Sequence, residues 1–205
     1  MTVVRLSRRP MPTIPDGYAD WFEPDQAGLG EWVRETFIND DGALYNERHQ
    51  HLAEATIGWL WTNAEHRDRN MTVLGMCQLV APVQAKWSSA RSHHQLVEWF
   101  GDAPDFVITI STAAAELSDR EFCALISHEL HHAEQDVDPF GAPRFTKQGH
   151  PIFRVVGHDF EEFVGVVNQF GATSHALRAA VEAINAGPLV DDKPIQIACG
   201  TCRSR

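Results

Sequence analysis

The sequence is poor in cysteine: it has four in 205 residues, too few for a scaffold held together by disulfides. Cys199 and Cys202 form a C-x-x-C near the C-terminus, but no second C-x-x-C supplies the remaining ligands of a structural zinc site. We therefore expect this pair to be inert, with metal binding or redox chemistry as the alternative.

Long apolar runs and an excess of basic charge are also missing. No run reaches the roughly 18 residues that a membrane span needs, and the first residues lack the apolar stretch of a secretory signal. We therefore expect a cytoplasmic protein with no membrane partner. The chain has 28 acidic residues but only 17 Lys and Arg. The resulting net charge of -11 argues against general nucleic-acid binding.

What the chain does have is an ordinary globular composition, with 43% hydrophobic and 22% charged residues. Its length suits one domain with a sizeable core. We predict an N-terminal arm over residues 1–40, which packs through Trp21 and Phe22, a domain over 41–190, and a C-terminal tail over 191–205.

Hydrophobic periodicity and turn residues predict both helices and strands within this domain. Helices are expected over 43–67, 119–136, 158–171 and 174–186, and strands over 71–80, 106–111 and 194–198. Pro and Gly residues make 137–157 a long irregular connection. The expected fold class is α+β, with a small mixed sheet packed against one central helix and further C-terminal helices.

The best-defined helix carries a metal-binding motif. Ser118 and Glu121 form a capping box at its start, and His128-Glu129-Leu130-His131-His132 follows within it as H-E-x-x-H. Four residues apart, His128 and His132 project from one helix face, as two ligands of a Zn²⁺ ion require. Glu129 can then act as the general base that takes a proton from a metal-bound water.

A catalytic zinc needs a third protein ligand, and the sequence offers several downstream. His158 stands at the start of the next predicted helix, and Glu162 lies one helical turn further on the same face. Glu162 can instead cap that helix together with Asp159. His158 and Glu162 therefore both remain candidates; weaker ones are His150, Asp159 and Glu161.

The order of these motifs resembles the metallopeptidases of phages and prokaryotes, a zincin-like family. The resemblance covers about residues 70–171 and depends on the H-E-x-x-H helix and on the later segment His158-Asp159-Phe160-Glu161-Glu162-Phe163, which matches H-D-x-x-[ED]-F. It implies a zincin-like fold, His128, His132 and His158 as zinc ligands, and Glu129 as the base. It implies no particular substrate.

The strand at 106–111 precedes the motif helix and is either an exposed edge that binds an extended peptide or a buried central strand. Arg144, His150 and Arg154 are the candidates for stabilising an oxyanion. We expect a zinc peptidase acting on a peptide or protein substrate. The alternatives are a zinc-binding regulatory or host-interaction protein without proteolysis and a zinc hydrolase of a non-peptide amide or ester.

Overall fold

The computed structural model describes residues 8–12, 20–68, 71–82, 84, 86–160, 167, 170–172, 174–187 and 198–199. The described residues up to Val156, together with 198–199, form one compact unit, and those from Gly157 to Gly187 belong to a second. None of the described helices has the length and apolar character needed to cross a membrane.

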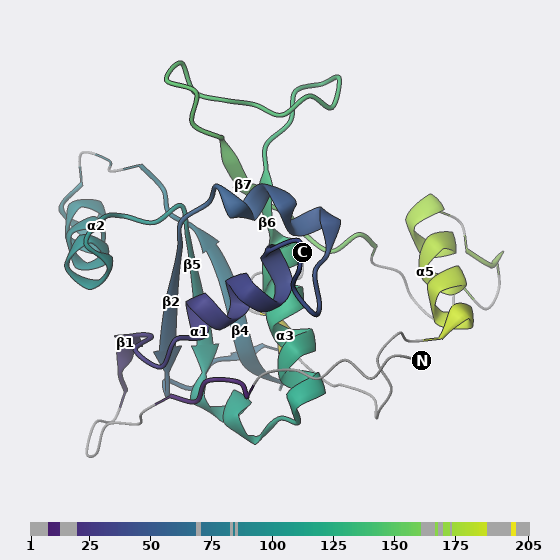
Figure 1. Cartoon of the computed structure of the whole chain (residues 1–205), viewed down its shortest axis with the longest axis horizontal. Helices are drawn as coiled ribbons and strands as arrows, with labels where there is room; N and C mark the ends of the chain where they lie inside the picture. Colours follow the sequence, from purple (N-terminus) through teal and green to yellow (C-terminus); the bar gives the residue numbers. More distant parts are fainter. Residues whose placement is uncertain are drawn as a thin grey trace. The chain divides into compact units, whose positions relative to one another are not determined.

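The larger unit contains both helices and strands, and most of its strand pairs are antiparallel, which confirms the α+β class (Figure 1). Its strands are β1 (Phe22–Pro24), β2 (Ile57–Thr62), β3 (Arg67–Asp68), β4 (Met71–Leu79), β5 (Phe106–Ser111), β6 (Ala133–Gln135), β7 (Phe153–Val155) and β8 (Ala198–Cys199). Its helices are α1 (Leu29–Val33), the π-helix η1 (Arg34–Ile38), the 3₁₀-helices η2 (Glu47–Ala53) and η3 (Thr112–Glu116), α2 (Trp87–Phe100) and α3 (Asp119–His132).

The main sheet has six strands in the order β1-β2-β5-β4-β3, with β8 paired to β4. Strands β2 and β5 are parallel, whereas β4 runs antiparallel to β5, so the sheet is mixed as expected. Because β5 lies between β2 and β4, it is a central strand; of the two alternatives for 106–111, the buried central strand is therefore confirmed and the exposed substrate-binding edge is excluded. The strand beside the motif helix is β4, which packs against α3.

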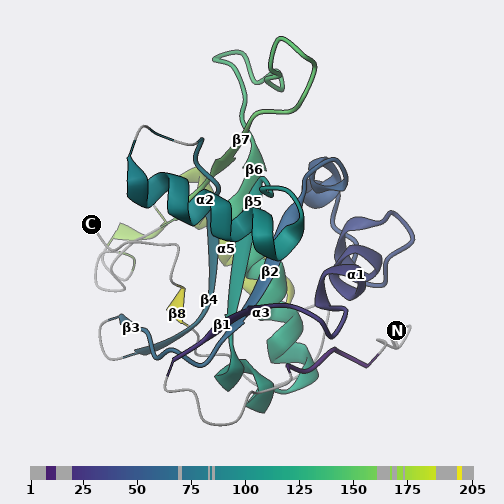
Figure 2. The same cartoon turned by 90° about the vertical axis from the view of Figure 1, so that its left-hand side faces the viewer.

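Side chains alternate between the two faces of the sheet, and this alternation separates two layers. On one face, Phe106, Ile108 and Ile110 are fully buried in the main core with α1 and α3. Helix α2 covers the other face (Figure 2). Leu60 and Val107 line a groove on that face together with side chains of α2. The motif helix is thus set on the better-packed face of the sheet.

Aromatic side chains connect the start of the chain to α3. Trp32 in α1 contacts both Phe37 and Phe122 at ring-centroid distances of 5.7 and 6.0 Å, and Trp61 of β2 stacks on Phe122. Trp21 is buried as expected, but Phe22 is 48% exposed. Residues 21–38 therefore contribute to the core, although they lie within the predicted arm, whose boundary at residue 40 stays a prediction.

The helix predicted over 43–67 is wrong: this segment forms the 3₁₀-helix η2 and then strand β2. Apart from Ile57 at its start, β2 is buried throughout, so its continuous apolar run lacks the alternation by which a half-buried strand is recognised. The strands predicted at 71–80 and 106–111 are confirmed as β4 and β5. Helix α3 begins with the predicted capping box and ends at His132, four residues earlier than predicted.

The second unit contains α5 (His175–Ala186), where Ser174 accepts a hydrogen bond from the Leu177 N–H as a helix N-cap and Gly187 ends the helix. This confirms the helix predicted there. The helix predicted over 158–171 falls largely outside the described residues, as do Glu161, Glu162 and Cys202.

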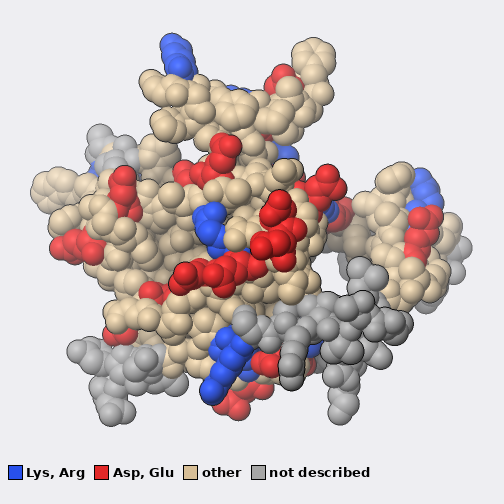
Figure 3. All heavy atoms as spheres, viewed as in Figure 1, with Lys and Arg blue, Asp and Glu red and all other residues tan. Residues whose placement is uncertain are grey.

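Charged side chains on the face shown in Figure 3 are mainly acidic, in line with the net charge of -11. The β6–β7 hairpin extends away from the main sheet, at the top of both cartoon views (Figures 1 and 2). The hairpin contains most of residues 137–157, the connection predicted to be irregular. Only the base of the hairpin forms strands.

Candidate metal centre

The motif histidines lie on the last turns of α3, which is fixed at both ends. At its start, the Ser118 hydroxyl accepts from the Glu121 N–H while the Glu121 carboxylate accepts from the Ser118 N–H at 2.9 Å. The Ser118 hydroxyl also donates to the Glu121 carboxylate at 2.7 Å, and this bond, followed by the one from the Ser118 N–H, lowers the pKa of Glu121. Between the ends, Phe122, Leu125, Ile126 and Leu130 are buried, so the helix cannot rotate without unpacking the core.

His128 and His132 face each other from consecutive turns. Their Nε2 atoms are 3.2 Å apart and their ring centroids 4.9 Å apart. His132 is almost completely buried, whereas His128 is half-buried. The two Nε2 atoms are therefore close enough to bind one ion.

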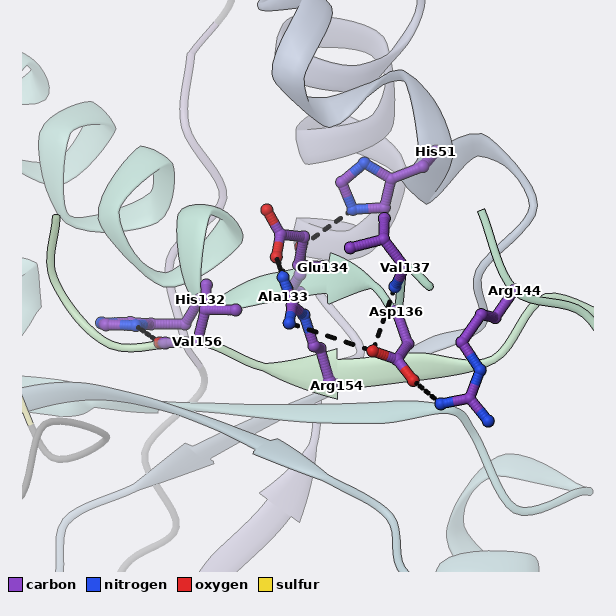
Figure 4. A network of polar contacts seen from close by, with 9 residues as sticks. All are labelled: His51, His132, Ala133, Glu134, Asp136, Val137, Arg144, Arg154 and Val156. Atoms are coloured by element: carbon purple, nitrogen blue, oxygen red, sulfur yellow. Dashed lines mark hydrogen bonds and ion pairs between the residues drawn. The ribbon is translucent and has the colours of Figure 1, made fainter. Parts of the chain in front are cut away.

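The other ring nitrogen of His132 is held by the backbone. Nδ1–H donates to the Val156 carbonyl at 2.6 Å, and the Val156 N–H donates back to the His132 carbonyl at 2.9 Å. Figure 4 shows this contact at the base of the hairpin. A proton on Nδ1 leaves Nε2 with a lone pair, the form of imidazole that binds a metal ion.

His158 comes two residues after Val156, and its side chain is exposed. Among the described residues, ligand atoms of His128, His132 and His158 all lie within 4.8 Å of one another. The structure thus brings together the three histidines that the resemblance implies, as a group able to hold a metal ion. Asp159 is exposed, and so is His150 on the hairpin.

Glu129 is completely buried against strand β4. A Cβ atom built on Gly75 would come within 2.6 Å of Glu129 Oε1 and 2.9 Å of its Cγ. Only a residue without a side chain leaves room there for the carboxylate. Sequence reasoning missed Gly75, although a glycine inside a predicted strand is a recognised signal of close approach.

The arginines considered for an oxyanion role are bound within the hairpin. Arg154 pairs with Glu134, and Arg144 pairs with Asp136 (Figure 4). The sequence did not predict these ion pairs or the hydrogen bond from His132 to the Val156 carbonyl. No sequence signal shows which residues contact each other across an irregular connection.

Comparison with known families agrees with this arrangement. A family described as "Putative phage metallopeptidase" matches residues 30–185. Neither a curated protein nor a solved structure matches the chain. The matched segment covers well over half of the 205 residues and includes the H-E-x-x-H helix and His158. The chain therefore belongs to this phage metallopeptidase family and has its zincin-like α+β fold.

Proposed function

We propose that the chain is a zinc-dependent peptidase in which His128, His132 and His158 hold the ion and Glu129 is the general base. The observation that carries the proposal is the pair of facing Nε2 atoms on α3. Nitrogen ligands at about 2.0–2.1 Å from a tetrahedral zinc are about 3.3 Å apart. The 3.2 Å between His128 and His132 agrees with that spacing.

The choice of zinc is also supported by the type of ligand. Neutral imidazoles suit zinc better than magnesium or calcium, which prefer oxygen ligands. Three protein ligands leave one coordination position open, as in catalytic zinc sites. When bound there, zinc supplies a Lewis acid that activates water for attack on a carbonyl.

The chain's own residues would divide the remaining work. The Val156 carbonyl keeps the proton of His132 on Nδ1 and fixes the direction of Nε2. The carboxylate of Glu129 would take the proton of the attacking water and pass it to the departing amine. Its buried position against Gly75 supports this role, because a carboxylate with little freedom to move is already oriented for proton transfer.

The decisive experiment is Glu129→Gln, which keeps the size of the side chain but removes its ability to accept the proton. We expect cleavage of an unbiased peptide library to fall by about 10²–10⁴-fold, the usual contribution of a general base. Zinc content, measured by elemental analysis, should stay at one ion per chain. Glu98→Gln, at an exposed site on α2, controls for the loss of one negative charge.

Three outcomes would contradict the proposal in different ways. Absence of zinc from the wild-type protein would remove the metal centre. Bound zinc without cleavage of any peptide would favour the zinc-binding regulatory or host-interaction protein. Cleavage confined to non-peptide amides or esters would favour the alternative hydrolase.

A further inference from the structure

The segment between the second and third proposed ligands is a hairpin with very short strands. It leaves α3 directly after His132 and returns through β7 to Val156. The pairing is antiparallel, with the register Ala133↔Val155, Glu134↔Arg154 and Gln135↔Phe153. Of these six residues only Ala133 is buried, so no alternation of buried and exposed side chains specifies the register.

Charged side chains supply the specificity that burial lacks. Glu134 and Arg154 are directly opposite each other, and Arg154 Nε donates to Glu134 Oε2 at 3.0 Å, with a second bond from Nη2 to the same oxygen. The guanidinium also lies 3.9 Å from Asp136, two residues beyond Glu134 in the chain (Figure 4). Arg154 therefore contacts two carboxylates on one face of the hairpin, and a one-residue slip would turn it away from both.

The register matters because the residue directly after β7 contacts a proposed zinc ligand. This residue, Val156, bonds to both the backbone and the imidazole of His132. A slip of one residue would shift Val156 along the strand by about 3.3 Å, further than a hydrogen bond can stretch. The Nδ1–H of His132 would then lose its acceptor, and the direction of Nε2 would no longer be fixed.

We infer that the Glu134–Arg154 pair sets the register of the β6–β7 hairpin, which makes Arg154 a positioning residue for His132. The inference depends on the proposed zinc site. Arg154 is not among the proposed ligands, and it acts through Val156.

The test compares two arginines on the same hairpin in the full-length protein. Arg154→Gln should weaken zinc binding by about 10–100-fold, the effect typical of removing a group that orients a ligand. Arg144→Gln also removes an arginine paired with an acid, but the pair is further from His132, so we expect unchanged affinity. Zinc affinity is measured by competition with a chromogenic chelator.

Two further measurements separate positioning from general stability. Exchange of the charges in Glu134→Arg with Arg154→Glu should restore most of the lost affinity. ¹⁵N NMR of the zinc-free protein should show the His132 proton on Nδ1 in the wild type and in Arg144→Gln, and a mixture of tautomers in Arg154→Gln.

The inference is overturned if Arg154→Gln binds zinc normally, if Arg144→Gln loses as much affinity, or if the exchanged pair restores none. Should Arg154→Gln fail to fold, the exchanged pair alone decides between these outcomes. If the wild-type protein binds no zinc, the proposed function fails. The His132 tautomer and the NMR contact between Ala133 and Val155 would still test the hairpin separately.

Discussion

Two pairs of histidines at the end of α3 have nearly the same spacing but different surroundings. Nitrogens of His128 and His132 are 3.2 Å apart, and nitrogens of His49 and His131 are 3.1 Å apart. In the first pair both closest atoms are Nε2. In the second pair, the closest atoms are Nε2 of His49 and Nδ1 of His131. This Nδ1 also donates a hydrogen bond to the Ser127 carbonyl at 2.6 Å.

The difference teaches that spacing alone does not make a metal site. In the His49–His131 pair, Nε2 of His49 is an acceptor. The Nδ1 of His131 that it approaches already directs its proton at a backbone carbonyl. His49 is also buried, and η2 holds it there while His51 bonds to the Ala133 carbonyl. The second pair therefore connects η2 to α3, whereas the first brings two Nε2 atoms together.

Removal of one histidine from each pair gives the largest expected contrast. His132→Ala deletes a proposed ligand and should weaken zinc binding by more than the roughly 100-fold that loss of a supporting group can cause. His131→Ala should leave zinc affinity unchanged and lower the melting temperature, because it removes the contact to η2. Competition titrations and thermal melts distinguish these effects. Equal zinc loss in both variants would mean that the two pairs do not differ in their role.

A second contrast concerns the carboxylate between the histidines. Gly75→Ala places a methyl group against Glu129 and should lower peptide cleavage by about 10²-fold, while zinc remains bound. Gly58→Ala in β2 is the matched control, because its Cβ would come within 2.7 Å of the Phe100 ring. Both variants should lose stability, but only Gly75→Ala should lose activity at full zinc occupancy. Retained activity in Gly75→Ala would show that Glu129 does not need its present position.

Sequence reasoning predicted α3 and its motif because local signals agree there. The capping box at Ser118 fixes the start of the helix, and helical spacing alone puts His128 and His132 on one face. The capping box and the spacing of the two histidines each involve residues no more than four positions apart in the sequence. The same reasoning failed over 43–67, where Leu52, Leu60 and Trp61 recur near a helical spacing but the segment divides into η2 and a buried strand.

The rest of the site depends on residues that are distant in the sequence. Contact of Val156 with His132 requires the hairpin register, and contact of Gly75 with Glu129 requires α3 to pack on β4. Neither leaves a periodic pattern. The choice between an edge and a central position for 106–111 stayed open for the same reason, since only the order of strands in the sheet shows that β5 is central.

The buried pair should also be detectable through pH. Burial, followed by the nearby His131, lowers the pKa of His49 from 6.5 to about 3. Well above pH 6.5 this ring is neutral in both states; between pH 6.5 and about 3 it is protonated mainly in the unfolded chain. Stability should therefore fall as pH drops from 6.5 towards 3, by about 1.4 kcal/mol per pH unit for this group.

Urea unfolding of the zinc-free protein between pH 7 and pH 4.5 measures this slope without interference from metal loss. His49→Gln should flatten it, whereas His94→Gln, at an exposed position on α2, should not. An unchanged slope in His49→Gln would assign the acid sensitivity to other groups.

The smallest expected effect lies at the opposite end of α3, away from both histidine pairs. Arg9 donates to the carbonyls of Ala115 and Leu117, forms an ion pair with Asp119 at 3.1 Å, and lies 4.8 Å from the centre of the Phe122 ring. Its side chain is only 11% exposed. Arg9→Gln should therefore reduce the free energy of unfolding by about 1.5–3 kcal/mol, as expected for hydrogen bonds from a charged group.

Arg8→Gln is the control for this variant, since it removes the same charge from an exposed neighbour and should have little effect on stability. Zinc affinity should be unchanged in both variants, because neither arginine belongs to the proposed ligand set and the packed middle of α3 separates Arg9 from His128. Chemical denaturation and zinc titration on the same preparations test this. Zinc loss confined to Arg9→Gln would show that the start of α3 controls the geometry at its end, and the two ends could no longer be treated as independent.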